Sequence, residues 1–356
     1  MVHGKRVALS LGSGGARGYA HIGVLQVLEE RGFEVVTIAG TSMGALVGGI
    51  AAAGKLDTYT EWSLGLTQRE VWRLLDLTFS APGAIRAERV LAKVSEILDG
   101  VAIEDLPIPF TAVATDLHAR REVWFQRGPL DQAIRASIAL PGFITPVMFN
   151  GRLLVDGGLM NPVPIEPTSV ASADLTVAVS LTGDRIPGAA ASPVKESSEP
   201  RAFEELAGRL RRSKAGVLES EAVRAITHRF SSTRAKDSPD SAHPLADSTH
   251  DPTASRDLPP AAGQTTTPPP DPVAVPQEPE PAAQTATLDV GLIELLNLSF
   301  DTMSSLITRY RMAANPPDVL IKVPANAVRT LDFHRAAEMI ELGRRLTTEA
   351  LDRAGH

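Results

Sequence analysis

Short apolar runs alternate with segments of helical periodicity through the first part of the chain. Val7–Leu11 and Val35–Ala39 have the length and composition of buried strands, and a helix-like segment follows each, over about 19–30 and from Met43. Strands and helices that alternate over short loops form parallel sheets with right-handed crossovers. The pattern therefore predicts an α/β fold, a three-layer α/β/α arrangement with a mainly parallel central sheet.

The same periodicity defines the rest of the expected elements. Up to residue 230, it predicts helices over most of 57–98, a hairpin at 110–128, a helix at 130–137, a strand ending at Asp156, a strand at Leu175–Leu181 and a charged amphipathic helix at about 200–229. Further on, "GLIELLNLSFDTMSSLITRYRMAA" is helical, "DVLIKVP" is a buried strand, and "DFHRAAEMIELGRRLTTEALDRA" is a long helix that Asp332 is placed to cap.

A Pro-rich segment at 231–287 interrupts this pattern. No aromatic residue lies between Ser231 and Ser299, and 12 of the 27 prolines fall between Pro239 and Pro281. Such a segment cannot bury enough apolar surface to offset its chain entropy. We expect one domain built from 1–230 and 288–356, interrupted by a disordered insertion at 231–287 that is available to a protein partner.

Composition excludes several classes of function. The chain has no cysteine, so disulfides, cysteine metal sites and thiol catalysis are ruled out. No apolar stretch approaches the ~18–20 residues of a spanning helix, and the first apolar run is too short for a signal peptide. The net charge is −7, and the densest basic stretch, 208–216, is interpreted as a solvated helix face, so no nucleic acid is expected as a partner. We expect a cytoplasmic protein with at most peripheral membrane contact.

The segment "GTSMG", Gly40 to Gly44, matches the G-x-S-x-G pattern of a nucleophilic serine. Such a serine stands on a sharp strand-to-helix turn, and the small residues two positions before and after it allow the backbone to make that turn. Here an apolar strand precedes the motif and a small-residue helix follows it. The context predicts that Ser42 is a nucleophile.

A nucleophilic serine needs a base, and the sequence leaves two acids open. None of the eight histidines stands at an obvious strand end after an acid, so a Ser-His-Asp triad is poorly supported. Asp156, in "LLVDGGLMNPVP", ends an apolar strand, and the carboxyl ends of strands are where α/β sheets hold their ligand chemistry. Asp116, in "ATDLHA", is also at a strand end and is a rival.

The glycine-rich stretch "SLGSGGARGYAHIGVL", residues 10–25, suggests a cradle for a negative group. A dinucleotide site requires G-x-G-x-x-G and an acid at the end of the second strand. Arg17 occupies the third glycine position and the second strand ends in Gly-Thr-Ser, so bound phosphate is disfavoured. Strands one and two are expected to be neighbours, which would place this loop beside Ser42 as an oxyanion hole.

Taken together, "GSGGARG", "GTSMG" and "DGG" resemble the patatin-like phospholipase family. "ASIALPGFITPV", 136–147, is similar to the family's Ala-Ser-x-x-x-Pro-Gly-x-x-x-Pro block, and "DFHRAAEMIELGRR" is similar to the bacterial branch related to neuropathy target esterase. The resemblance covers about 5–230 and 290–352. The Pro-rich insertion is a departure from the compact members of the family.

The resemblance implies a Ser-Asp dyad and an acyl-ester hydrolase of phospholipase or lysophospholipase type. By motif, Ser42 is the nucleophile, Asp156 is the base, and the N–H groups of Gly14, Gly15 and Ala16 form the oxyanion hole, with Arg17 bracing the loop. Asp116 is then structural. No metal or cofactor is expected.

An acyl chain would also need an apolar groove. The candidate walls lie within 62–85, and ordinary helix core explains each of them equally well: Trp62, Leu64, Val71, Trp72, Leu74, Leu75, Leu77, Phe79 and Ile85. Two other functions stay open at this point. One is a catalytically weak member of the family that acts as a regulatory or interaction module, and the other is a nucleotide-binding domain.

Overall fold

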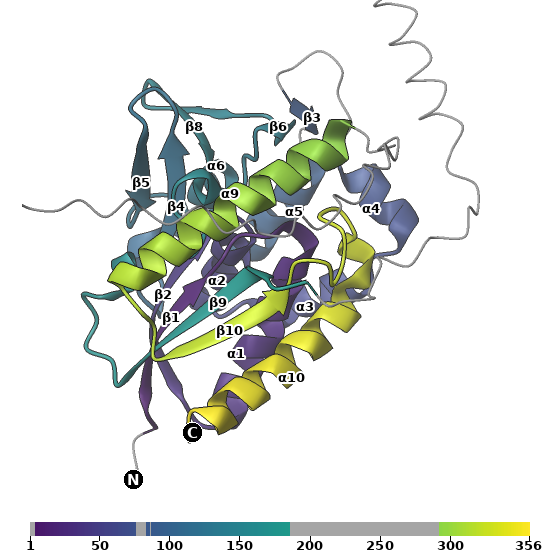
Figure 1. Cartoon of the computed structure of the whole chain (residues 1–356). Coiled ribbons are helices and arrows are strands. Elements are labelled where there is room, and N and C mark those ends of the chain that lie inside the picture. The colour runs from purple at the N-terminus through teal and green to yellow at the C-terminus, as the bar shows by residue number, and fades with distance from the viewer. Residues whose placement is uncertain (1–3, 76–82, 86, 186–291) are drawn as a thin grey trace, which may run out of the picture. The chain divides into compact units, whose positions relative to one another are not determined.

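The computed structural model describes residues 4–75, 83–85, 87–185 and 292–356, all within one compact unit that joins 1–193 to 289–356 (Figure 1). Its strands are β1 (Arg6–Leu11), β2 (Glu34–Thr41), β3 (Gly83–Ile85), β4 (Phe110–Asp116), β5 (Arg121–Phe125), β6 (Gly142–Ile144), β7 (Val147–Phe149), β8 (Arg152–Asp156), β9 (Leu175–Gly183) and β10 (Val319–Pro324). Its α-helices are α1 (Ala20–Glu30), α2 (Met43–Ala52), α3 (Leu56–Leu64), α4 (Gln68–Leu74), α5 (Glu88–Leu98), α6 (Leu130–Ser137), α9 (Leu292–Ala314) and α10 (Ala336–Arg353). Short 3-10 turns are η1 (Gly15–Tyr19), η2 (Ile103–Asp105), η3 (Gly157–Leu159), η4 (Glu166–Thr168) and η5 (Phe333–Arg335).

A mixed sheet forms the centre of the described part of the chain. Its order is β10-β9-β1-β2-β4-β8-β7, with β5 paired to β4 outside that path. The strands β10, β9, β1, β2 and β4 are parallel, whereas β5 and β8 run antiparallel to β4, and β7 runs antiparallel to β8. The expected α/β class, the pairing of the first two strands and the hairpin at 110–128 are therefore confirmed.

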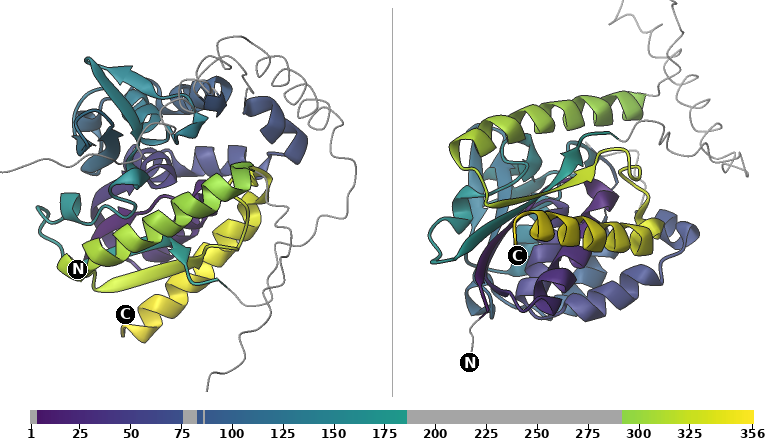
Figure 2. Two further views of the ribbon diagram at one scale, coloured as in Figure 1. Left: turned by 45° about the horizontal axis from the view of Figure 1, so that its top comes forward. Right: turned by 60° about the horizontal axis from the view of Figure 1, so that its bottom comes forward.

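Helices cover both faces of this sheet, as a three-layer arrangement requires. On one face α1, α2 and α10 pack against the strands, and α9 lies across the opposite face (Figure 2). The main core fills the first interface and includes Leu9, Ile22, Ile38 and Val179, all fully buried. Because β1 lies between two parallel neighbours with helices on both sides, all of its residues after Arg6 are buried, which explains its continuous apolar run.

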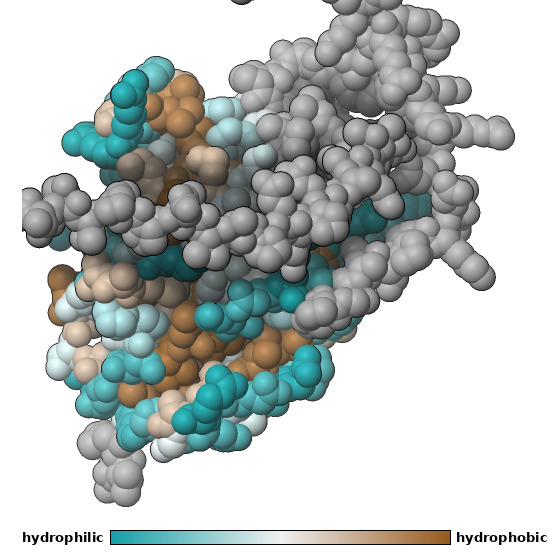
Figure 3. Space-filling view, viewed as in Figure 1, coloured by the Kyte–Doolittle hydropathy of each residue, from teal (hydrophilic) through white to brown (hydrophobic). Residues whose placement is uncertain are grey.

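The C-terminal segment completes this unit. Strand β10 pairs with β9 at the edge of the sheet, and α10 packs against α1. Between α9 and α10, where β10 forms that edge, hydrophobic residues reach the surface (Figure 3).

Several expectations need correction or stay untested. Asp332 does not cap the last helix, because its carboxylate accepts the Arg329 N–H (3.1 Å) and the helix proper begins at Ala336. The mainly helical stretch at 57–98 also contains β3. The helix at 200–229, the basic stretch at 208–216 and the insertion at 231–287 lie outside the described residues, so the domain boundaries remain a prediction.

Candidate active site

Ser42 lies at the turn between β2 and α2, in a strained backbone conformation. Its φ of 56° and ψ of −121° are unusual for a residue with a side chain, and such strain clusters at functional sites. The flanking glycines are required sterically. A Cβ on Gly40 would lie 2.2 Å from the Gly44 carbonyl oxygen, and one on Gly44 would lie 1.9 Å from the Leu11 carbonyl oxygen.

A buried hydroxyl fixes the orientation of this turn. The Ser42 N–H donates to Ser137 Oγ (2.9 Å), which itself donates to the Val113 carbonyl (2.6 Å). Ser137 ends α6 and belongs to the "ASIALPG" block, but the sequence offered no reason to single it out. This link joins β2, β4 and α6 at the serine.

Asp156 lies at the same height as Ser42 along the sheet, on a strand that runs antiparallel to its neighbour β4. Strand β8 is antiparallel to β4, with Asp156 opposite Ala114, and Thr41 on β2 is opposite Val113. Asp156 therefore stands two strands away from Ser42 and at the same height, and not at the carboxyl end of a parallel strand. The glycines after it permit close approach, since a Cβ on Gly157 would lie 2.2 Å from the Val113 carbonyl oxygen.

Burial controls the acidity of Asp156. Its side chain is 1% exposed and accepts the Gly158 N–H at 2.7 Å. Burial raises the pKa of this carboxyl from 3.8 to about 6, against the lowering effect of hydrogen bonding with the Ser42 hydroxyl and the Gly158 N–H. A carboxylate with this pKa is ionised at neutral pH and is more basic than an exposed one, which suits a general base.

The glycine loop is held on both sides by backbone contacts. The Gly12 N–H donates to the Val179 carbonyl (3.0 Å) and the Ser13 N–H to the Pro162 carbonyl (2.8 Å). His21 Nε2 lies 2.8 Å from the Gly12 carbonyl oxygen, and burial lowers the pKa of His21 to about 4, so the neutral ring donates this hydrogen bond. His21 therefore supports the loop and does not act as a base toward Ser42.

The three amides assigned to the oxyanion hole differ in their contacts. The Ala16 N–H donates to the Thr330 carbonyl at 2.9 Å, so this amide is already engaged. Among the described residues, no backbone carbonyl accepts from the amides of Gly14 or Gly15. Gly15 has a φ of +58° and borders the same cavity as Ser42. The structure therefore leaves Gly14 and Gly15 as available donors and removes Ala16.

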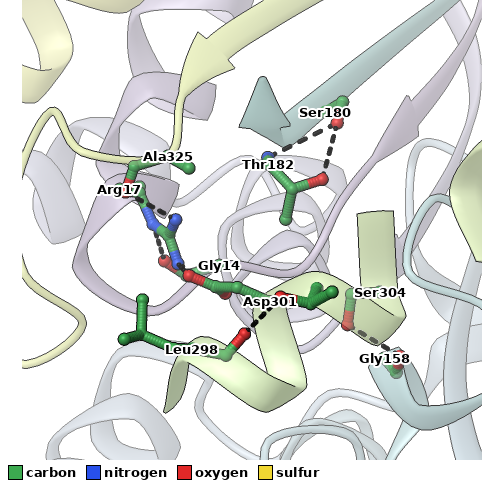
Figure 4. Close-up of polar contacts among 10 residues, drawn as sticks. Gly14, Arg17, Gly158, Ser180, Thr182, Leu298, Asp301, Ser304 and Ala325 are labelled. Atoms are coloured by element: carbon green, nitrogen blue, oxygen red, sulfur yellow. Dashed lines mark hydrogen bonds and ion pairs between the residues drawn. The ribbon is translucent and has the colours of Figure 1, made fainter. Parts of the chain in front are cut away.

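Arg17 is buried and ties this loop to the C-terminal segment (Figure 4). Its Nε donates to the Gly14 carbonyl (2.9 Å), its Nη1 to the Ala325 carbonyl (2.9 Å), and its Nη2 to both carboxylate oxygens of Asp301 (3.1 and 3.2 Å). The contact with Gly14 is the bracing contact expected from the sequence.

An apolar groove of about 910 Å³, the space open to solvent included, begins at Ser42 and Gly15. Its lining is almost wholly hydrophobic: Tyr19, Met43, Leu46, Tyr59, Trp62, Leu66, Val71, Leu74, Leu75, Ala87, Val90, Ile138, Leu140, Phe143, Ile144, Leu331 and Phe333. An almost wholly apolar lining next to a reactive side chain is typical of a small-molecule site.

Comparisons with known proteins show which family the chain belongs to. The sequence pattern of the family described as patatin-like phospholipase matches residues 9–169. An uncharacterised NTE family protein of Mycobacterium tuberculosis is 46% identical over 348 residues, which are 98% of this chain and 91% of the relative. The chain belongs to the NTE family of patatin-like proteins.

Other relatives match about half of this chain. A lysophospholipase of Cryptococcus neoformans, named NTE1, is 38% identical over 172 residues, 46% of this chain and 10% of that protein. A mouse patatin-like phospholipase domain-containing protein is 34% identical over 188 residues, 51% of this chain and 14% of that protein. Membership of this family supports lipid hydrolysis as the class of activity.

Asp116 has a different position in this NTE family protein. Its carboxylate accepts the N–H groups of His118 (3.1 Å) and Ala119 (3.0 Å) and lies 4.0 Å from the Arg152 guanidinium. Asp116 therefore stabilises the turn between β4 and β5.

Most of the groove lining could not be predicted from the sequence. Of the residues predicted to line it, Trp62, Val71, Leu74 and Leu75 do so, whereas Leu64 and Trp72 are about half exposed. Leu77 and Phe79 lie outside the described residues, and the side chain of Ile85 is not described. The other walls come from η1, α2, α3, the segment before α4, the start of α5 and the segments around 138–144 and 330–333, and no local motif marks these as groove residues.

Two further observations concern the described residues. No group of three or more histidine or acidic side chains is placed there to hold a metal ion. None of the helices in that part of the chain has the length and apolar character needed to cross a membrane.

Proposed function

We propose that this protein is a serine acyl-ester hydrolase of lipids, of phospholipase or lysophospholipase type, with Ser42 as nucleophile and Asp156 as base. The observation that carries the proposal is the junction of three features: a serine on a strained turn, a buried carboxylate with a pKa of about 6, and an apolar groove that begins at that serine.

Asp156 takes the proton of the Ser42 hydroxyl as the serine oxygen attacks the ester carbonyl. The bond between carbonyl carbon and serine oxygen forms, and the carbonyl π electrons move to its oxygen. When the tetrahedral intermediate collapses, the protonated Asp156 gives its proton to the departing alcohol or lysolipid. Water then attacks the acyl-serine with Asp156 again as base, which releases the fatty acid and restores Ser42.

The oxyanion of both intermediates is stabilised by the amides of Gly14 and Gly15. A donor of this kind contributes about 2.7–4 kcal/mol to lowering the barrier in other enzymes. Amide donors are suited to a charge that appears only during the reaction, because they are already fixed in place by the loop contacts and need no reorganisation.

The groove supplies binding energy for one acyl chain. Each methylene that leaves water contributes about 0.8 kcal/mol, so a long chain is favoured strongly over a short one. A related protein bears the name lysophospholipase, and lipids with a single acyl chain are the substrates that fit this groove most simply.

The test is hydrolysis of a panel of phospholipids, lysophospholipids and neutral esters by the wild type, by Ser42→Ala and by Asp156→Asn, with folding checked by circular dichroism. We expect the wild type to release fatty acid from a single-chain lipid and both variants to lose at least about a thousandfold in kcat. Equal activity in the wild type and Ser42→Ala would exclude the proposed nucleophile.

A further inference from the structure

Helix α9 buries several polar side chains against the sheet and leaves several apolar ones exposed to solvent. Ser304 and Thr308 are buried, and Asp301 is three-quarters buried, whereas Met303, Leu306 and Tyr310 are 56%, 47% and 72% exposed. A helix that packs only for stability buries its apolar face. The inner face of α9 therefore makes polar contacts in addition to the apolar packing of Met312.

Those contacts fall on both loops of the candidate site (Figure 4). Asp301 pairs with Arg17 of the glycine loop, and the Ser304 hydroxyl donates to the Gly158 carbonyl (3.4 Å), next to the amide that binds Asp156. Two turns further on, α9 also contacts the Asp156 loop through Arg311, whose guanidinium donates to the Met160 carbonyl (3.3 Å).

We infer that Asp301 is a positioning residue for the oxyanion loop and acts through Arg17. The Arg17 side chain is 2% exposed, and Asp301 is its carboxylate partner, held by a two-pronged contact. Asp301 fixes the guanidinium plane, and the Nε of that plane holds the Gly14 carbonyl. The Gly14–Gly15 peptide, which carries one of the proposed donor amides, thereby keeps its direction. The inference rests on the proposed function.

Loss of the Asp301 charge would leave a buried guanidinium without its counterion. A buried cation in that situation draws in water or turns toward other acceptors, since desolvation without a partner is unfavourable. Arg17 would then release the Gly14 carbonyl, and the loop would lose definition. Ground-state binding in the groove would change little, because Asp301 does not line the groove.

The experiment compares the wild type, Asp301→Asn and Asp301→Glu with a control on the outer face of the same helix, Arg309→Gln. Concentrations of active sites are set by titration with a phosphonate, so that unfolded protein does not count. For each variant, kcat and KM are measured on a p-nitrophenyl acyl ester. Inhibition constants are measured for an alkyl trifluoromethyl ketone, which forms a tetrahedral oxyanion on serine, and for the matching fatty acid, which does not.

We expect Asp301→Asn to lose about tenfold to a hundredfold in kcat, less than the ~100–1000-fold of removing a donor outright. Affinity for the ketone should fall by a similar factor, with KM and affinity for the fatty acid within about threefold of the wild type. Asp301→Glu, which keeps the charge, should recover most of the loss, and Arg309→Gln should match the wild type.

Three results would overturn the inference. One is a kcat and a ketone affinity in Asp301→Asn within about twofold of the wild type. Another is an equal loss of affinity for ketone and fatty acid, which would indicate a general loss of structure. A third is a wild type that neither hydrolyses esters nor reacts with the phosphonate; this outcome would end the proposed function as well, whereas the first two leave it intact.

Discussion

Asp156 makes the proposed chemistry depend on pH. Its carboxyl must be ionised to accept the serine proton, and burial raises its pKa to about 6. We predict that kcat/KM rises with pH and levels off above a midpoint near pH 6, as measured with a soluble ester from pH 4.5 to 8.5. The matched control is Asp116→Asn, which should keep both the rate and the midpoint. A midpoint near pH 4, or a normal rate in folded Asp156→Asn, would contradict the assignment of the base.

The same raised pKa predicts an effect on stability. Between about pH 4 and pH 6 the native protein keeps a proton that the unfolded chain, with a carboxyl pKa near 3.8, releases. Rising pH therefore lowers the free energy of unfolding across this window, by as much as about 3 kcal/mol. Asp156→Asn should accordingly be more stable than the wild type at pH 8 and lose that advantage at pH 4, in urea unfolding at both values. An advantage of the same size at both pH values would contradict the burial of a charge.

At the scale of elements, the turn between β2 and α2 is the part that sequence predicts best. The spacing of Gly40, Ser42 and Gly44 has a steric cause, and the contacts of these glycines are as close as the pattern requires. Asp156 ends its strand as expected, but the antiparallel direction of β8 could not be predicted. The apolar run "LLV" indicates a strand but carries no information on its direction, which β4 decides by pairing.

The turn gives a prediction for Gly44→Ala. A Cβ there would lie 1.9 Å from the Leu11 carbonyl oxygen, so β1 and α2 would have to separate. We expect a loss of about 3 kcal/mol in the free energy of unfolding, together with loss of esterase activity. The control is Gly54→Ala, where φ is +66° and no heavy atom lies within 4 Å; it should cost only about 1–2 kcal/mol of backbone strain and keep activity. Equal effects in the two variants would contradict the role of the close approach.

At the scale of the whole molecule, the candidate site joins segments that are far apart in sequence. The strands and helices of the core could be predicted from the sequence, because each of them carries its own hydrophobic periodicity. The contributions of Asp301, Thr330 and Phe333 could not be predicted in this way. Each acts through one contact that forms only when the C-terminal segment folds back on the sheet. A single residue at such a contact leaves no periodic signal.

The groove shared by these segments predicts a preference for chain length. Leu75 is buried and lines the groove, so Leu75→Trp should shorten it. We expect kcat/KM for a long-chain p-nitrophenyl ester to fall about a hundredfold. Three to four methylenes of its chain would no longer be buried in the groove, and each buried methylene contributes about 0.8 kcal/mol. The butyrate ester should change less than about threefold. Leu64→Trp, on a half-exposed position outside the groove, is the control, and parallel losses on both esters in Leu75→Trp would argue against an acyl site there.

The most direct test of the central claim is covalent labelling of Ser42. Folded protein is incubated with an alkyl fluorophosphonate, and the adduct is located by mass spectrometry of the intact chain and its peptides, with Ser42→Ala and Asp156→Asn alongside. We predict one adduct per chain, located on Ser42. Ser42→Ala should form no adduct, and Asp156→Asn should form it far more slowly. A folded wild type that takes up no label, or carries it on a different residue, would contradict this prediction.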